Sequence, residues 1–166
     1  YQEGVIDRFE ESSCDLGLVL GFSGNGDDDG YDCTPLPELE LLLVAAPEHP
    51  LAGRVIDDTS RAGHAEIVVR DSSPRFARES KPSFMGSSNV VYLSDFHSKR
   101  LAMLEGAGYG WIPRHLIEND LRAGRLQELQ TQVSRWNYRP QIITRLNDSL
   151  GRGGRLFLKT LKEGLT

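Results

Sequence analysis

The stretch that decides the fold is Arg100–Leu129, RLAMLEGAGYGWIPRHLIENDLRAGRLQEL, which predicts a helix, a glycine turn, a short buried strand and a second helix in that order. The apolar residues at helical spacing in the first helix are Leu101, Leu104 and Ala107. We expect Gly106 and Gly108 to end this helix, because glycine tolerates a positive φ that other residues avoid.

The second half of the stretch continues the pattern. A strand is predicted over Tyr109–Ile112 and is stopped by Pro113. A helix follows over His115–Ala123, closed by Gly124, and a last strand runs over Arg125–Leu129. The apolar residues of this second helix are Leu116, Ile117 and Leu121. This order is typical of a βα unit that lines a cleft.

The rest of the chain also alternates between helix and strand patterns. The predicted helices cover Gln2–Ser12, Asp57–Gly63 and Gly151–Leu161, and the predicted strands cover Asp15–Leu20, Leu39–Ala46, Ala65–Arg70, Asn89–Leu93 and Gln141–Arg145. The polar, glycine-rich stretch Gly24–Asp32 predicts a solvated loop. Strands alternating with helices favour an α/β fold with parallel sheets.

The order of the elements divides the chain into two lobes. We expect residues 1–49 and 134–166 to form lobe I and residues 50–133 to form lobe II, with hinges near His49 and near Ser134–Tyr138. Because the chain passes twice between the lobes, two crossover strands and a hinged cleft are predicted. Periplasmic solute-binding proteins use the same architecture.

Ligands of parallel sheets bind at the carboxyl ends of the strands, which selects the candidate site residues. The predicted effector-binding residues are Arg70, Asp71, Ser72, Ser73, Ser94, Asp95, Phe96, His97, Gly21, Phe22 and Trp111. Hydroxyl groups, amide donors and an arginine suit a small carboxylate, and the aromatic side chains suit an apolar or aromatic body. Structural interpretations remain beside this one, since Ser94 or Asp95 is equally suited to cap a helix and Arg70 to pair with a carboxylate of its own lobe.

The sequence resembles the effector-binding domain of LysR-type transcriptional regulators. The residues of the decisive stretch that match its glycine and proline pattern are Gly106, Gly108, Pro113, Gly124 and Leu126. Three further segments are similar to a strand, to the crossover strand with its His-Pro-Leu turn and to the closing helix of that family, namely Cys14–Leu20, Leu36–Ala52 and Gly151–Leu161. The resemblance covers nearly the whole chain.

This resemblance implies a type II periplasmic-binding-protein-like fold and a sensor function. An effector bound between the lobes would alter DNA binding by a winged helix-turn-helix domain that the sequence does not contain, in a cytoplasmic homodimer or homotetramer. The first strand, helix and strand of the family's domain have no counterpart here, so we expect an incomplete first lobe. The alternatives are a periplasmic solute-binding protein of a transport system and, third, an enzyme with the same bilobal fold.

Charge and hydropathy argue against nucleic-acid binding by this chain and against a membrane span. Nineteen basic and 24 acidic residues give a net charge of −5, which disfavours nucleic-acid binding by this chain itself. The longest apolar run, Leu41–Pro47, is too short to span a membrane, and the amino-terminal residues lack the pattern of a signal peptide. We therefore expect neither membrane association nor secretion.

The residue types of several catalytic and metal sites are present at unsuitable spacing. Asp95, His97 and Ser98 lie too close in sequence to form a hydrolase triad. The acidic loop around Asp27 lacks the final glutamate of a calcium loop, and the four histidines share no zinc-ligand spacing. Cys14 and Cys33 have no basic neighbours and are predicted to be reduced and structural. We therefore expect no metal, no cofactor and no catalysis.

Overall fold

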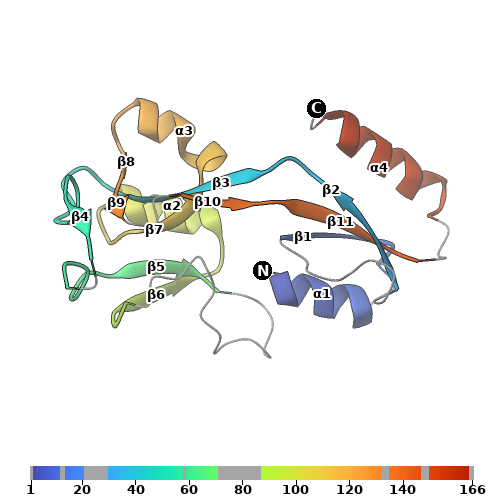
Figure 1. Ribbon diagram of the computed structural model, residues 1–166, viewed down its shortest axis with the longest axis horizontal. Helices are drawn as coiled ribbons and strands as arrows, with labels where there is room; N and C mark the ends of the chain where they lie inside the picture. Colours follow the sequence, from blue (N-terminus) through green and yellow to red (C-terminus); the bar gives the residue numbers. More distant parts are fainter. Residues whose placement is uncertain are drawn as a thin grey trace. The chain divides into compact units, whose positions relative to one another are not determined.

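The computed structural model describes residues 2–11, 14–20, 30–57, 59–70, 87–131, 135–146 and 150–164 (Figure 1). These residues fall into two compact units. The first contains the described parts of 1–39 and 138–166, and the second contains the described parts of 40–70 and 78–137. Within the described residues, the chain passes between the units at 39/40 and at 137/138. The lobe boundaries expected from the sequence, at residues 49 and 134, stay a prediction.

The first unit is an antiparallel sheet with a helix packed on it. Its elements are α1 Gln2–Glu11, β1 Leu16–Leu20, β2 Tyr31–Pro35, β11 Pro140–Arg145 and α4 Arg152–Gly164. The strand order is β1-β11-β2, and β11 runs antiparallel to both neighbours. Phe9 of α1 packs against Val19 and Ile143 to form a small core in which all three side chains are buried.

The second unit contains the remaining elements. They are β3 Leu39–Ala45, β4 Val55–Ile56, β5 Glu66–Val69, β6 Val90–Leu93, α2 Phe96–Leu104, β7 Gly110–Pro113, α3 Arg114–Arg122, β8 Gln127–Glu128, β9 Gln130–Thr131 and β10 Arg135–Tyr138. One sheet has the order β10-β3-β7, with β8 also paired to β3. Two shorter sheets pair β5 with β6 and β4 with β9 in parallel.

The core of the second unit is formed by β3 and β5 together with elements of the stretch 100–129. Its buried cluster consists of Leu42, Val44, Ile67, Met103, Ile112, Ile117 and Leu126. Leu42 is in register with Ile112, and Leu43 is in register with Trp111. Because successive strand residues point to opposite faces, Leu43 and Trp111 lie on the face opposite this cluster.

Parallel pairing was predicted for both lobes, and it is found only in the second unit among the described strands. β5 and β6 are parallel as expected, whereas every strand pair described in the first unit is antiparallel. The reason is that β11 enters the sheet of the first unit after a passage through the second unit and pairs between β1 and β2 in the opposite direction. A helix followed by a strand therefore did not determine the direction of pairing.

The two predicted glycine turns are confirmed, but one glycine acts differently. Gly106 has φ +73° directly after the C-cap of α2, and Gly124 has φ +67° after the C-cap of α3. Gly108 has no positive φ. A Cβ at Gly108 would lie 2.3 Å from the carbonyl oxygen of Ala65, so close backbone approach requires this glycine.

Several element predictions are wrong in detail. The described residues of the expected helix Asp57–Gly63 form turns, because Ser60 N–H donates to Asp57 Oδ1 at 2.7 Å and draws the backbone into a local turn. The loop predicted up to Asp32 already contains the start of β2. On α2 the buried residues are Lys99 and Met103, while Leu101 is 45% exposed. Among the described helices, none is long and apolar enough to cross a lipid bilayer.

Candidate functional site

The carboxyl ends of β5 and β6 bring several predicted site residues together. Val69 and Leu93 are partners at the end of this parallel pair, and Arg70 N–H donates to the Leu93 carbonyl oxygen at 2.9 Å. Arg70 and Ser94 therefore follow the two strands at the same edge. The Arg70 side chain is exposed, and its guanidinium carbon lies 5.1 Å from the centroid of the Tyr92 ring. This cation–π contact gives the exposed arginine a defined position.

Asp95 caps the amino-terminal end of α2. Its Oδ1 accepts the Ser98 N–H at 2.8 Å, and its Oδ2 accepts the hydroxyl groups of Ser94 and Ser98 at 2.8 and 3.0 Å. These hydrogen bonds, the Ser98 N–H first, lower the pKa of Asp95 to about 2. The helix terminus thus already holds a carboxylate, and the structural interpretation of Asp95 is correct whatever else the residue binds.

The other predicted site residues are spread over the fold. Phe96 is partly buried against the core of the second unit, and His97 is exposed on α2. Trp111 is buried on β7, which belongs to a different sheet from β5 and β6. Asp71, Ser72, Ser73, Gly21 and Phe22 lie outside the described residues, as do the acidic loop residues 25–29. Among the described members of the predicted set, Arg70, Ser94 and Asp95 lie together.

A tryptophan pair is a feature that the sequence interpretation missed. Trp136 on β10 lies edge-on to Trp111, with ring centroids 6.2 Å apart and ring planes at 74°. Both indole nitrogen atoms are buried and have no hydrogen-bond acceptor in the described part of the chain. The only available signal was composition, since these are the two tryptophans of the chain.

Buried ionisable residues form a second cluster in the same unit. Glu66 is fully buried, and its carboxylate accepts the Ser87 N–H at 3.2 Å. Lys99 is 2% exposed, and burial lowers its pKa to about 8 although the nearby charge of Glu66 opposes this shift. No pattern predicted a lysine on the buried face of α2.

Two histidines and a tyrosine adjoin this cluster. The His49 ring lies 5.2 Å from the His64 ring and 6.1 Å from the Tyr109 ring, measured between centroids. His49 Nδ1 accepts the Leu51 N–H at 3.2 Å, which places the proton of the neutral imidazole on Nε2. Burial first, and then the charge of His64, lower the pKa of His49.

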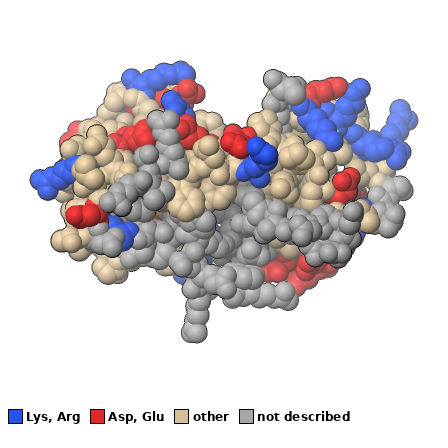
Figure 2. All heavy atoms as spheres, viewed as in Figure 1, with Lys and Arg blue, Asp and Glu red and all other residues tan. Residues whose placement is uncertain are grey.

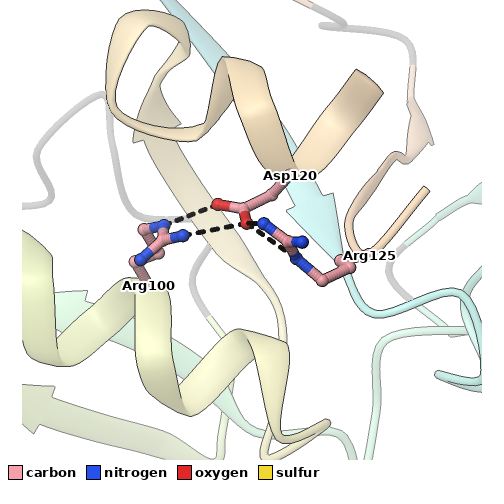
Figure 3. A network of polar contacts seen from close by, with 3 residues as sticks. All are labelled: Arg100, Asp120 and Arg125. Carbon is pink, nitrogen blue, oxygen red and sulfur yellow. Dashed lines mark hydrogen bonds and ion pairs between the residues drawn. The ribbon is translucent and has the colours of Figure 1, made fainter. Parts of the chain in front are cut away.

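A third cluster centres on Asp120 of α3 and is drawn in Figure 3. Arg100 donates to both carboxylate oxygens of Asp120, at 2.5 and 2.8 Å, and Arg125 donates to Oδ1 at 2.6 and 3.1 Å. The carboxylate is buried, and hydrogen bonds from Arg100 are the first cause that lowers its pKa. The network ties α2, α3 and the turn after α3 together, so its role is structural.

The described residues contain no group of three or more histidine, cysteine, aspartate or glutamate side chains that is arranged to bind a metal ion. Cys14 is exposed, and Cys33 is half-buried on β2. On the face shown in Figure 2, basic side chains gather mainly over α4, which carries Arg152, Arg155, Lys159 and Lys162, and acidic side chains lie among the basic ones elsewhere.

The chain matches a known protein family and is similar to several known proteins. The family described as the LysR substrate binding domain matches residues 1–166. The HTH-type transcriptional activator AllS of Klebsiella pneumoniae is 25% identical over 115 residues, which are 68% of this chain and 42% of that protein. The uncharacterized HTH-type transcriptional regulator YeeY of Escherichia coli strain K12 is 31% identical over 99 residues, which are 56% of this chain and 30% of that protein. The chain spans less than half the length of these curated relatives.

Solved structures show the same fold. The regulatory domain of CcmR from Synechocystis PCC6803, solved in complex with 2-PG, has a TM-score of 0.69 and 18% identity over 99% of this chain and 80% of that one. Full-length LysG from Corynebacterium glutamicum with bound effector Arg has a TM-score of 0.72 and 13% identity, over 99% of this chain and 55% of that one. The α/β, type II periplasmic-binding-protein-like fold expected from the sequence is thereby confirmed, and the chain belongs to the LysR substrate-binding domain family.

Proposed function

We propose that this chain is the effector-binding part of a transcriptional regulator, in which a small molecule changes DNA binding by a winged helix-turn-helix domain outside the chain. The observation that carries the proposal is the family match over all 166 residues, together with relatives that are named as HTH-type regulators and of which the matched region is only 42% and 30%. The same relatives favour a regulator over a transport receptor and over an enzyme, and they agree with a cytoplasmic location.

The proposed mechanism is a shift between two arrangements of the units. β3 and β10 are neighbours in one sheet, and each carries one passage of the chain between the units. A ligand that prefers one arrangement stabilises it by the difference between its affinities for the two. In a homodimer or homotetramer this difference would change the spacing of the attached DNA-binding domains.

The effector is proposed to be a small carboxylate or aromatic compound. Arg70 supplies an exposed guanidinium at the carboxyl ends of β5 and β6, and Asp95 supplies an ionised carboxylate one strand away. These two side chains suit an anionic group and a hydrogen-bond-donating group of the ligand, respectively. The remaining candidates, Phe96, His97 and Trp111 among them, stay predictions.

A thermal-shift screen tests effector binding. Amino acids, short hydroxy and oxo acids, substituted benzoates and benzamides are added to the 166-residue chain, and we expect one class to raise Tm with saturation. Arg70→Ala should abolish the shift, whereas Arg155→Ala on α4 should keep it. Asp95→Asn keeps the helix cap but removes the charge, so it separates a binding role of Asp95 from its capping role.

The regulatory step is tested on the whole gene product. The compound that raises Tm should change how strongly the gene product retards promoter DNA in a gel. It should also change the assembly state of the gene product in analytical ultracentrifugation. A screen in which no class of compound raises Tm, or a gene product that does not bind DNA, would contradict the proposed function.

A further inference from the structure

Trp111 and Trp136 share a property that the fold itself does not explain. Their indole Nε1 atoms are buried and have no acceptor among the described residues, although the two rings are in contact. A buried donor without an acceptor is unfavourable by about 1–3 kcal/mol, so native proteins rarely keep one without a purpose. Two such donors on neighbouring rings are suited to acceptors supplied by a molecule outside the chain.

The surroundings of the pair decide the chemistry of that molecule. Trp111 is in register with Leu43, which is fully buried, on the face of the strands opposite the core of the second unit. The rings of Trp111 and Trp136 also contact each other. A full negative charge is costly to bury against neutral donors and apolar side chains. An uncharged oxygen on a planar, apolar body suits both the donors and the rings.

The position of the pair connects it to the passages between the units. The two tryptophans lie on β7 and β10, which flank β3. The second passage follows Trp136 by one residue, between Asn137 and Tyr138, and the first passage lies at the beginning of β3. A ligand that fixes Trp136 therefore acts on a strand through which the chain crosses from one unit to the other.

We propose that Trp111 and Trp136 bind an uncharged carbonyl group of the effector, such as that of an amide, a lactone or a ring ketone, through their indole N–H groups. This inference rests on the proposed effector-binding function and adds to it the class of ligand group that the pair recognises. A carboxylate elsewhere on the same effector would bind to Arg70.

The chain has two tryptophans, so its ¹⁵N-labelled form gives two indole cross-peaks, which Trp111→Phe and Trp136→Phe assign. In the absence of ligand, both indole protons should resonate upfield, as donors without an acceptor do. Benzamide should move both downfield with saturation, and each substitution should weaken its binding about tenfold or more, which corresponds to about 1.4 kcal/mol. Benzoate, which is the charged isostere and also suits Arg70, should need an at least about tenfold higher concentration to move the indole protons, and toluene should move neither.

Other outcomes overturn the inference. Indole protons that are already downfield without ligand would mean that water or the chain supplies the acceptors. Failure of benzamide to saturate, or movement of both indole protons at a lower concentration of benzoate than of benzamide, would exclude an uncharged carbonyl at the pair. If a phenylalanine variant loses its folded amide spectrum, benzothienylalanine, which keeps the ring shape and lacks the N–H, replaces that tryptophan. A screened compound that raises Tm but leaves both indole signals unchanged overturns this inference alone and leaves the proposed function in place.

Discussion

Two carboxylates of the second unit are fully buried, and their cations differ in access to water. Asp120 is held by Arg100 and Arg125, whose side chains remain 27% and 55% exposed. The charge of Glu66 acts on Lys99, which is 2% exposed. The first carboxylate thus meets cations that keep part of their hydration, and the second meets a cation that has lost nearly all of it.

Because of this difference, the stability of the fold depends on the charge state of Lys99 more than on that of Asp120. Guanidinium groups that stay in contact with water form charge-assisted hydrogen bonds at a small desolvation cost, so the Asp120 network holds its charge over a wide pH range. An ammonium removed from water loses hydration that one carboxylate only partly replaces, which is why the pKa of Lys99 falls to about 8. Asp120 is a fixed structural link, whereas Lys99 is sensitive to pH and to loss of its partner.

The largest effect should come from breaking the dehydrated pair. Lys99→Met removes the buried cation nearest in charge effect to the buried Glu66, and we expect the free energy of unfolding at pH 7 to fall by about 3–5 kcal/mol. The double variant Glu66→Gln/Lys99→Met removes both charges and should recover most of this loss. Urea denaturation measures both values, and a double variant no more stable than the single one would show that Glu66 is not the cause.

The Asp120 network should lose less stability when its charged acceptor is replaced. Asp120→Asn replaces a charged acceptor by a neutral one while both arginines remain in contact with water, so we expect a loss of about 2–3 kcal/mol. Glu118→Gln is the matched control, because Glu118 lies on the same helix in an exposed pair with Arg122 and should cost less than about 0.5 kcal/mol. Equal losses in the two variants would remove the distinction between the buried and the exposed acid.

The pH dependence of the free energy of unfolding should also distinguish Lys99 from the Asp120 network. Between the pKa of about 8 in the folded chain and 10.5 in the unfolded chain, the unfolded chain holds a proton that folded Lys99 has released. Stability should therefore rise with pH in this window, by about 2 kcal/mol from pH 8 to 10. Lys99→Met should lack this rise, and Asp120→Asn should keep it. A flat profile for the unmodified chain would mean that Lys99 stays protonated in the folded state.

The smallest expected effect is the loss of stability at low pH that protonation of His49 causes. The pKa of His49 is lowered from 6.5 by burial and by His64, so below pH 6.5 the unfolded chain takes up a proton before the folded chain does. We expect stability to fall by under about 1 kcal/mol as the pH drops from 6.5 to about 5. His49→Gln should reduce this fall in thermal unfolding. Identical slopes for the unmodified chain and this variant would contradict a protonation effect at His49.

Local patterns predicted the elements well where one local rule decides the conformation. Gly106 and Gly124 end their helices at positive φ, and Asp95 caps α2, because each of these features depends on a few neighbouring residues. The prediction failed where a distant segment decides. Gly108 is required by the carbonyl group of Ala65, and β2 is a strand because it pairs with β11 more than one hundred residues away in sequence.

The candidate site was predictable to a similar extent. Arg70 and Ser94 follow strands that are parallel neighbours, so the rule on strand ends placed them at one edge correctly. Trp136 was missed because β10 has no periodic pattern that distinguishes it from a linker, and its contact with Trp111 exists only across β3. Lys99 was missed because a lysine on a helix is ordinarily solvated.

The sequence by itself determined the order of elements, the turns and the family, because backbone propensity, capping and hydrophobic period act over a few residues and leave a readable pattern. The tertiary structure alone decided the antiparallel sheet of the first unit, the burial of Lys99 and Glu66, and the tryptophan pair, whose indole donors have no acceptor among the described residues. These features arise from contacts between segments far apart in the chain, whose strength depends on packing and on the exclusion of water.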